Sequence, residues 1–441
     1  MAEKVGFISL GCAKNLVDSE HMLAALDDAG YEVTGEIENT LAVVINTCGF
    51  LASAREEALE NIAEVALLKD EGKVGNIIVT GCLSERDRES LFEQNPAIDA
   101  LVGCGSYHKI VEVLERVKNG ERVCAFDELT AEPLEQSRIL TTPHYFSYLK
   151  IAEGCNNRCS YCVIPSLRGP YRSRAMEDIV AEAEGLAESG TRELIVIAQD
   201  TSRYGTDRYG KRMLPELLKA LCKIEKLKWI RVHYLYPDEI DDELIEVIAS
   251  EEKVVKYLDI PIQHVNDRIL TAMNRRGDHK YLDALFTKLR ERIPGVVLRT
   301  SLIAGLPGET DEEFEELCDF LARHKLERVG VFPYFPEPGS VAAELPDQVE
   351  DDVKEHRCEL ISNLQDRIMD AFNQSRIGSE VEVVVEGYDR YAEAFFGRTY
   401  CDSPEIDGKV FFTAEGKCAV GEFVTVRLLE DLDGDLIGER I

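Results

Sequence analysis

Short apolar runs alternate with longer amphipathic stretches along most of this chain, and that rhythm limits the fold more than any other feature. The first three apolar runs are each followed by a helical pattern, and these six segments are 5–10, 15–29, 41–45, 52–68, 77–79 and 85–92. A weaker unit follows, with a strand expected at 100–102 and a helix at 107–117. Because strands that alternate with helices form parallel sheets, we predict an open parallel α/β sheet for residues 1–126.

Six further strand–helix units occupy residues 145–374. Their predicted strands are 148–152, 193–197, 229–234, 257–260, 296–302 and 328–333. The amphipathic helices predicted between or after them include 178–189, 214–224, 281–292, 312–325 and a long charged helix at 349–374. Repeated units of this kind curl into a full or partial barrel with its chemistry at the carboxyl ends of the strands. We predict a (β/α)6 partial barrel.

The remaining segments lack this rhythm. Residues 127–144 show no periodicity and are predicted to be a linker. Residues 375–441 contain three strand-like runs, 381–385, 410–413 and 423–428, separated by turns rich in Gly and Asp. That pattern is typical of a small antiparallel β-barrel of the oligonucleotide-binding kind. The predicted fold class is therefore α/β with a small β-barrel at the carboxyl end.

Composition restricts the location and the partners of the protein. The chain starts directly in a strand pattern and has no long apolar run, so we expect no signal peptide, no membrane span and a cytoplasmic location. Thirteen cysteines in such a chain indicate metal ligation or burial more than disulfides. The formal net charge of −33 disfavours phosphate backbones and suits a basic protein partner. Solubility, or an organism whose proteins are all acidic, explains the charge equally well.

Three cysteines, Cys155, Cys159 and Cys162, lie within eight residues directly after a predicted strand. Thiolates at this spacing let one short loop wrap an iron–sulfur cluster. A cubane has four irons, so three sulfurs leave one iron open for the amino and carboxylate groups of S-adenosylmethionine. A zinc knuckle is the alternative, but zinc requires a fourth ligand, and neither His108 nor His144 has a suitable spacing.

A second set of cysteines follows the first three strands, one strand–helix unit apart. Cys12, Cys48 and Cys82 each come directly after a predicted strand and are each next to a glycine. The carboxyl ends of neighbouring parallel strands are where such sheets bind ligands. We therefore predict a second cluster here, against the alternative of three buried small hydrophobes. Cys104 is either a spare ligand or a bystander, and we favour the bystander; Cys222 and Cys318 lie in apolar helical stripes and fit core thiols.

These motifs resemble the methylthiotransferase family of radical S-adenosylmethionine enzymes over essentially the whole chain. The opening ISLGCAKNLVDSE at 8–20 is similar to the branch of the family that modifies a ribosomal protein. The run EGCNNRCSYCVIPSLRG at 153–169 resembles the radical loop, and DIPIQH at 259–264 and GLPGET at 305–310 also fit. The tail resembles the family's TRAM domain. Ala13 and Cys104 depart from the usual pattern, and residues 334–340 match a barrel motif only loosely.

The resemblance implies two 4Fe-4S clusters, S-adenosylmethionine and a definite reaction. A methylthio group is added to the β-carbon of one aspartate in small-subunit ribosomal protein S twelve. That C–H bond is unactivated, so a radical cofactor is required. The implied partners are this basic ribosomal protein as substrate and an electron donor such as flavodoxin; neither a membrane nor nucleic acid as direct substrate is expected.

Contacts to S-adenosylmethionine are also expected from the resemblance and from position. Tyr161 lies inside the radical loop, where the family places an aromatic side chain against the adenine, although core packing explains it nearly as well. Gln199 ends the second barrel strand, and Arg299 and Ile303 flank the fifth. Each of these residues has a barrel-lining structural role as its alternative. A basic stretch, Arg168 to Arg174, is either a solvated loop or a contact to a carboxylate substrate.

The alternative enzyme is a tRNA adenosine methylthiotransferase of the MiaB type. That branch usually opens with Gly-Cys-Gln-Met-Asn, whereas residues 11–15 here are GCAKN. Residues 375–441 carry seven basic and fifteen acidic side chains, a balance of −8. An RNA-gripping barrel needs cationic contacts to phosphate, so the balance favours a basic protein substrate. A non-enzymatic electron carrier is a third possibility, but it has no need of a six-unit barrel.

Overall fold

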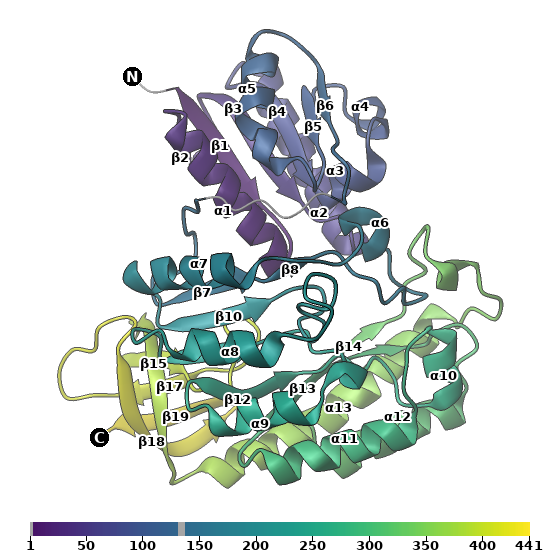
Figure 1. Ribbon diagram of the computed structural model, residues 1–441, viewed down its shortest axis with the longest axis vertical. Coiled ribbons are helices and arrows are strands. Elements are labelled where there is room, and N and C mark those ends of the chain that lie inside the picture. Colours follow the sequence, from purple (N-terminus) through teal and green to yellow (C-terminus); the bar gives the residue numbers. More distant parts are fainter. Residues whose placement is uncertain (1–2, 131–136) are drawn as a thin grey trace.

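The computed structural model describes residues 3–130 and 137–441. Figure 1 shows an N-terminal α/β part, a central part with a curved sheet and a C-terminal β-barrel beside the central part. The predicted fold class, including the partial barrel and the small closed barrel, is confirmed. Residues 131–136 of the predicted linker lie outside the described residues.

The N-terminal sheet has the order β2-β1-β3-β4-β5-β6, and all of its neighbouring strands run parallel. Its strands are β1 (Lys4–Ser9), β2 (Glu32–Thr34), β3 (Thr40–Thr47), β4 (Val74–Gly81), β5 (Ala100–Val102) and β6 (Val123–Ala125). Sequence periodicity missed β2 and β6. Both are three-residue edge strands, which are too short to display a period of two.

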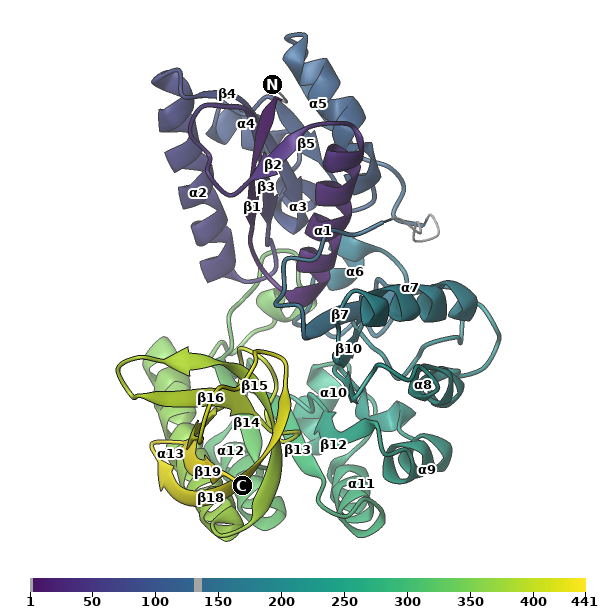
Figure 2. The same cartoon turned by 90° about the vertical axis from the view of Figure 1, so that its left-hand side faces the viewer.

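Helices cover both faces of the N-terminal sheet (Figure 2). They are α1 (Ala13–Asp28), α2 (Ala52–Asp70), α3 (Cys82–Asp87), α4 (Ser90–Gln94), η1 (Tyr107–Lys109) and α5 (Ile110–Lys118). The single helix predicted over 85–92 is in fact two short helices. Arg88 between them has φ +45°, outside the right-handed helical region, and this conformation ends α3.

The central sheet contains six parallel strands in the order β14-β13-β12-β11-β10-β7 and stays open between β14 and β7. Its strands are β7 (Phe146–Lys150), β10 (Glu193–Ile197), β11 (Trp229–Val232), β12 (Val254–Asp259), β13 (Val297–Ala304) and β14 (Arg328–Pro333). Side chains alternate between two buried faces along these strands, as the period of two requires. In β10, Leu194 and Val196 face the helices, whereas Ile195 and Ile197 face the concave side.

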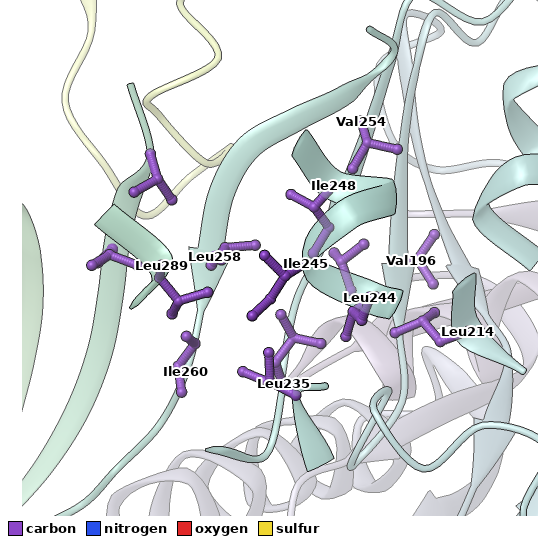
Figure 3. Close-up of a cluster of buried hydrophobic side chains, with 14 of the residues drawn as sticks. Val196, Leu214, Leu235, Leu244, Ile245, Ile248, Val254, Leu258, Ile260 and Leu289 are labelled. Carbon is purple, nitrogen blue, oxygen red and sulfur yellow. The ribbon is translucent and has the colours of Figure 1, made fainter. Parts of the chain in front are cut away.

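The convex face of the central sheet is covered by amphipathic helices. The helices of this part are α6 (Ile164–Arg168), α7 (Met176–Glu188), α8 (Leu214–Cys222), α9 (Asp242–Ser250), α10 (Asp267–Ala272), α11 (His279–Arg292), α12 (Asp311–His324) and α13 (Asp351–Arg376). Figure 3 shows Leu244, Ile245 and Ile248 of α9 packed against strand residues such as Leu258. Burial of each such side chain contributes about 1.5–3 kcal/mol. The remaining elements are β8 (Ala152–Glu153), β9 (Arg172–Ser173), η2 (Pro237–Glu239) and η3 (Val341–Glu344).

The C-terminal barrel is closed by five strands in the order β15-β16-β17-β19-β18. They are β15 (Glu380–Asp389), β16 (Ala394–Arg398), β17 (Val410–Thr413), β18 (Phe423–Leu432) and β19 (Asp435–Arg440). All neighbouring pairs are antiparallel except β17 and β19. Sequence reasoning missed β16 and β19, whose glycines at 397 and 438 interrupt the apolar pattern where the backbones approach closely.

The concave face of the central sheet is filled from both ends. Val384 and Cys401 of the C-terminal barrel pack on it at one end, and Val17 of α1 packs on it at the other. Buried ion pairs join the barrel to the sheet, including Arg398 with Glu193 at 2.8 Å. The site is thus restricted to the carboxyl ends of the strands, where the N-terminal sheet meets the central sheet. None of the helices in residues 3–130 and 137–441 has the length and apolar character of a membrane span.

Candidate active site

Residues 154–163, which carry Cys155, Cys159 and Cys162 and are called the radical loop from here on, run between β8 and α6 without regular secondary structure. The backbone N–H of Asn157 donates to the Cys155 sulfur at 3.5 Å, and that of Ile164 donates to the Cys162 sulfur at 3.4 Å. Backbone donors aimed at sulfur stabilise a thiolate, which is the form that binds iron. All three cysteines of this loop are partly buried and unpaired as disulfides.

The second cysteine set lies at the carboxyl ends of β1, β3 and β4, which are neighbours in the sheet. Cys12 precedes α1, Cys48 follows β3, and Cys82 begins α3. Glycines make room for them. A Cβ on Gly11, which has φ +92°, would lie 2.9 Å from the Cys48 Cβ, and one on Gly49 would lie 2.6 Å from the Cys82 carbonyl carbon. Only glycine fits these positions without displacing a cysteine.

Both cysteine sets line one cavity of about 480 Å³. Three of its thiols come from the N-terminal sheet and three from the radical loop, so the cavity lies between the two parts of the chain. The structure therefore brings together cysteines that are up to 150 positions apart in sequence. Cys104 is not among the lining residues, but its thiol is buried and donates to the Cys82 sulfur at 3.9 Å.

The thiols differ in acidity. Burial raises the pKa of Cys155 to about 11 and that of Cys162 to about 12, and burial also raises the pKa of Cys48. The pKa of Cys82 is instead lowered to about 6, first because Cys104 donates a hydrogen bond to it and also because the Arg168 guanidinium lies beside it. A bound metal reverses the effect of burial, since it stabilises the thiolate directly.

Arg168 links the two parts of the site. Its guanidinium is 2% exposed and lies on α6, immediately after the radical loop. It donates to Asp18 at 2.6 Å, to Asn15 at 3.0 Å and to the Cys82 sulfur at 3.3 Å. Arg168 is therefore not part of a solvated loop. It is buried, and its hydrogen bonds connect α6 to α1 and α3 of the N-terminal part.

Three of the four residues predicted to contact S-adenosylmethionine lie at or beside the cysteine cavity. Tyr161 and Gln199 line it, and Ile303 lines an adjoining cavity that Tyr161 shares. The Gln199 amide donates to Glu153 at 2.9 Å, while its buried oxygen has no partner. Arg299 is not brought to either cavity. Its guanidinium donates to Asp259 at 2.7 Å and lines a separate cavity against the C-terminal barrel.

The adjoining cavity has a volume of about 420 Å³ and shares four lining residues with the first, namely Phe50, Leu51, Tyr161 and Gln263. Its rim is apolar and open: Leu51, Phe332 and Phe335 are each about half exposed. Sequence reasoning missed this cavity. Its only signal was a run of aromatics at the end of β14, which we interpreted as a loosely matching barrel motif.

Arg275 was also missed because it lies on a loop far along the chain. It is buried, and its guanidinium donates to the Tyr161 hydroxyl at 3.2 Å and to the Cys159 sulfur at 3.8 Å. A cation at this distance offsets the negative charge of a thiolate. It therefore forms part of the wall of the radical loop.

The donor set fits clusters better than single ions. Within the described residues, no group of three His, Cys, Asp or Glu side chains converges closely enough to hold one metal ion. Zinc needs its sulfur ligands about 2.3 Å from a common centre. A cubane instead takes one thiolate at each of several irons, so its ligands need not converge on one point.

Three family models match the chain in succession. The Radical SAM superfamily matches residues 149–321, the Uncharacterized protein family UPF0004 matches residues 4–103, and the TRAM domain matches residues 377–441. The cavity with six cysteines lies between the first two of these regions.

Curated relatives match the chain from end to end. The Ribosomal protein uS12 methylthiotransferase RimO of Thermoanaerobacter sp. strain X514 is 45% identical over 99% of this chain and 100% of its own length. The protein of the same name from Acetivibrio thermocellus is 46% identical over 100% of this chain and 99% of its own length. This chain belongs to the RimO family of radical SAM methylthiotransferases. The prediction of the ribosomal-protein branch over the tRNA branch is confirmed.

Solved structures support the fold. The radical S-adenosylmethionine methyltransferase TsrM of Kitasatospora setae, which was solved with a [4Fe-4S] cluster and cobalamin, has a TM-score of 0.57 and 17% identity over 78% of this chain and 77% of that chain. The cobalamin-dependent enzyme OxsB has a TM-score of 0.56 and 11% identity over 84% of this chain and 56% of that chain. Enzymes of the RimO family use S-adenosylmethionine and two [4Fe-4S] clusters, as the paired cysteine sets predict.

Proposed function

We propose that this RimO-family protein adds a methylthio group to the β-carbon of an aspartate in ribosomal protein uS12. Cys155, Cys159 and Cys162 hold the radical cluster in this proposal, and Cys12, Cys48 and Cys82 hold the auxiliary cluster. The observation that carries the proposal is the single cavity lined by both sets. A substrate atom in this space is within reach of both centres, which a two-step exchange of hydrogen for sulfur requires.

When bound, the radical cluster supplies the electron that cleaves S-adenosylmethionine, and the auxiliary cluster carries the sulfur that is transferred. Residues of this chain hold and orient the reactants. The unpaired oxygen of Gln199 is available to accept from the amino group of S-adenosylmethionine. Tyr161, fixed by Arg275, presents a ring for the adenine, and Ile303 borders the adjoining cavity. Arg299 has no part in this proposal, because Asp259 already neutralises it.

An enclosed cavity favours sulfur transfer, because a carbon radical formed on the substrate must react with the sulfur before side reactions consume it. Two sets of polar contacts hold the N-terminal sheet against the radical loop, and the first is made by Arg168 with Asp18 and Cys82. In the second set, Arg86 of α3 forms an ion pair with the buried Glu337 and donates to the Pro338 carbonyl at 2.9 Å. We further propose that the protein works in the cytoplasm with an electron donor such as flavodoxin.

The test is anaerobic reconstitution with iron and sulfide, followed by assays with purified uS12 and with bulk tRNA. Wild-type protein should modify uS12 and leave tRNA unmodified. Cys159→Ala should abolish reductive cleavage of S-adenosylmethionine, whereas Cys48→Ala should retain cleavage and lose sulfur insertion. Cys222→Ala is the matched control, since Cys222 packs against the central core away from the site. Equal cleavage by the Cys159 and Cys48 variants would contradict the assigned roles.

A further inference from the structure

Lys14 is a buried cation without an acidic partner. Its side chain is 7% exposed and lines the cavity with the six cysteines. Its ammonium packs on the face of the Tyr234 ring, whose centroid lies 3.2 Å from Nζ. Among the described residues, no carboxylate lies within ion-pair distance of this nitrogen.

The acidic groups near this end of α1 are already neutralised by other cations. Asp18, one turn further along the helix, pairs with Lys150 and Arg168. Glu153 pairs with the same two cations. Asp259, which accepts a hydrogen bond from the Tyr234 backbone N–H, pairs with Arg299. The charge of Lys14 therefore has no counterion in the protein chain around it.

The position of Lys14 makes this charge more costly. Burial removes water from the ammonium, and an aromatic face replaces only part of that hydration. Lys14 is also the second residue of α1, where the aligned peptide dipoles are positive, so the helix repels it as well. Two positive groups pointing into one cavity, a lysine and a helix N-terminus, form a site for an anion.

Tyr234 places the ammonium between the two cavities. It lines the adjoining cavity, whereas Lys14 lines the cysteine cavity. Its backbone has φ +62°, a conformation that is strained for an aromatic residue. The strain is held by Asp259, which accepts from the Tyr234 N–H at 3.1 Å, and by Thr201, whose N–H donates to its carbonyl at 3.0 Å. Strain maintained at such a position indicates a functional constraint.

We propose that Lys14 binds the side-chain carboxylate of the substrate aspartate. This inference rests on the proposed function. The substrate segment enters over the apolar rim formed by Leu51, Phe332 and Phe335, and its carboxylate reaches the ammonium at the junction of the two cavities. Lys14 follows Cys12 by two residues, so the carboxylate is held on the auxiliary side of the cavity. The adjacent β-carbon then lies between the two cysteine sets.

The competing role for Lys14 is that of a counterion to the auxiliary cluster. The two roles predict different responses to the charge of the substrate side chain. A counterion affects cluster loading and does not sense the substrate's charge, whereas a carboxylate-binding lysine distinguishes aspartate from asparagine. Lys14→Met removes the charge and keeps a side chain of similar length.

The experiment measures the affinity of the reconstituted protein for fluorescently labelled uS12 carrying either the target aspartate or asparagine at that position. Wild-type protein should bind the aspartate form more tightly, and Lys14→Met should weaken that binding by roughly 30-fold, equivalent to about 2 kcal/mol. Binding of the asparagine form should change little. Iron content should stay at the wild-type value, because Lys14 supplies no sulfur to either cysteine set. The matched control is Lys219→Met, because Lys219 is an exposed lysine on α8.

Equal weakening of both uS12 forms, or loss of about half of the iron, would overturn the carboxylate contact while leaving the proposed function intact. If wild-type protein neither bound nor modified either form of uS12, that result would instead contradict the proposed function and, with it, this inference.

Discussion

The Arg168 guanidinium donates to the Cys82 sulfur at 3.3 Å, and this contact joins the segment after the radical loop to a cysteine of the other set. The same side chain donates to Asp18 of α1 at 2.6 Å. Both partners are buried, and Arg168 itself is 2% exposed. The two halves of the site are therefore held together by a charged network as well as by apolar packing.

Removal of this cation should destabilise the protein strongly. Arg168→Met leaves Asp18 and Glu153 with Lys150 as their remaining cationic partner, and breaking such a buried network typically costs about 3–5 kcal/mol. We expect a fall of that size in the free energy of unfolding, measured by urea denaturation. Arg172→Met is the matched control, because Arg172 is only half-buried and donates to backbone carbonyls. Equal stability of the two variants would show that the network carries little energy.

Iron content should divide equally between the two cysteine sets. Replacing Cys12, Cys48 and Cys82 together by Ala should leave about half of the wild-type iron after anaerobic reconstitution, since each cluster depends on its own thiolates. The triple replacement of Cys155, Cys159 and Cys162 should leave the other half. A double variant at Cys222 and Cys318, which pack against the central core, should keep all of the iron. Retention of full iron by either triple variant would contradict the assignment of that set.

The cysteine sets were predictable from sequence because their signals are local. Three thiols in eight residues, and three thiols after successive strands, depend on chain order alone. The meeting of the two sets in one cavity depends on how α6 packs against α3 and α1, which no local pattern encodes. Arg168 and Lys14 show the same limit, since a basic residue in a polar stretch is usually exposed and both are buried.

Arg299 lies away from the two cavities at the cysteines. Arg299 lies within β13 on the same face as Ser301 and Ile303, which line the adjoining cavity. It is nearer the amino end of the strand, however, and there its guanidinium donates to Asp259 and lines the cavity against the C-terminal barrel. The charge of that barrel shows a similar effect. Asp402 is buried against Arg328 of the central sheet, so the count of −8 overstates by one the negative charge that faces solvent. The pair of Glu386 with Arg398 leaves the balance unchanged, because both residues belong to the barrel.

Stability should fall as the pH decreases below 6.5. His233 is buried, and burial lowers its pKa from 6.5 to about 3, so the folded protein keeps it neutral while the unfolded chain protonates it. Because the folded pKa is depressed, the contribution is fully present above pH 6.5 and is lost as the pH falls towards 3. At pH 5 the loss should be about 2 kcal/mol for this residue.

His233→Asn should remove that share of the pH dependence. The measurement is the free energy of unfolding at pH 7.5 and at pH 5 for wild type and variant. His356→Asn, at an exposed position on α13, is the control and should leave the wild-type slope unchanged. An unaltered slope in the His233 variant would mean that another group dominates the acid transition.

Charge on the C-terminal barrel should steer a basic substrate. Glu415 and Glu430 are exposed there, and reversing both to Lys changes the balance of residues 375–441 from −8 to −4. We expect slower association with uS12 at low salt and little difference at high salt, because the Debye length shrinks to about 3 Å at 1 M. The control reverses Glu243 and Glu291 on the central helices, which changes the total charge equally. Faster association by the barrel variant would contradict the steering argument.

Mass spectrometry of uS12 tests the central claim most directly. Ribosomal subunits would be isolated from cells that lack this protein and from the same cells supplied with wild type, with Cys159→Ala or with Cys48→Ala. The account predicts that wild type alone adds the mass of one methylthio group to a single aspartate-containing peptide of uS12. Unmodified uS12 together with a methylthio group on tRNA, dependent on the same cysteines, would contradict it.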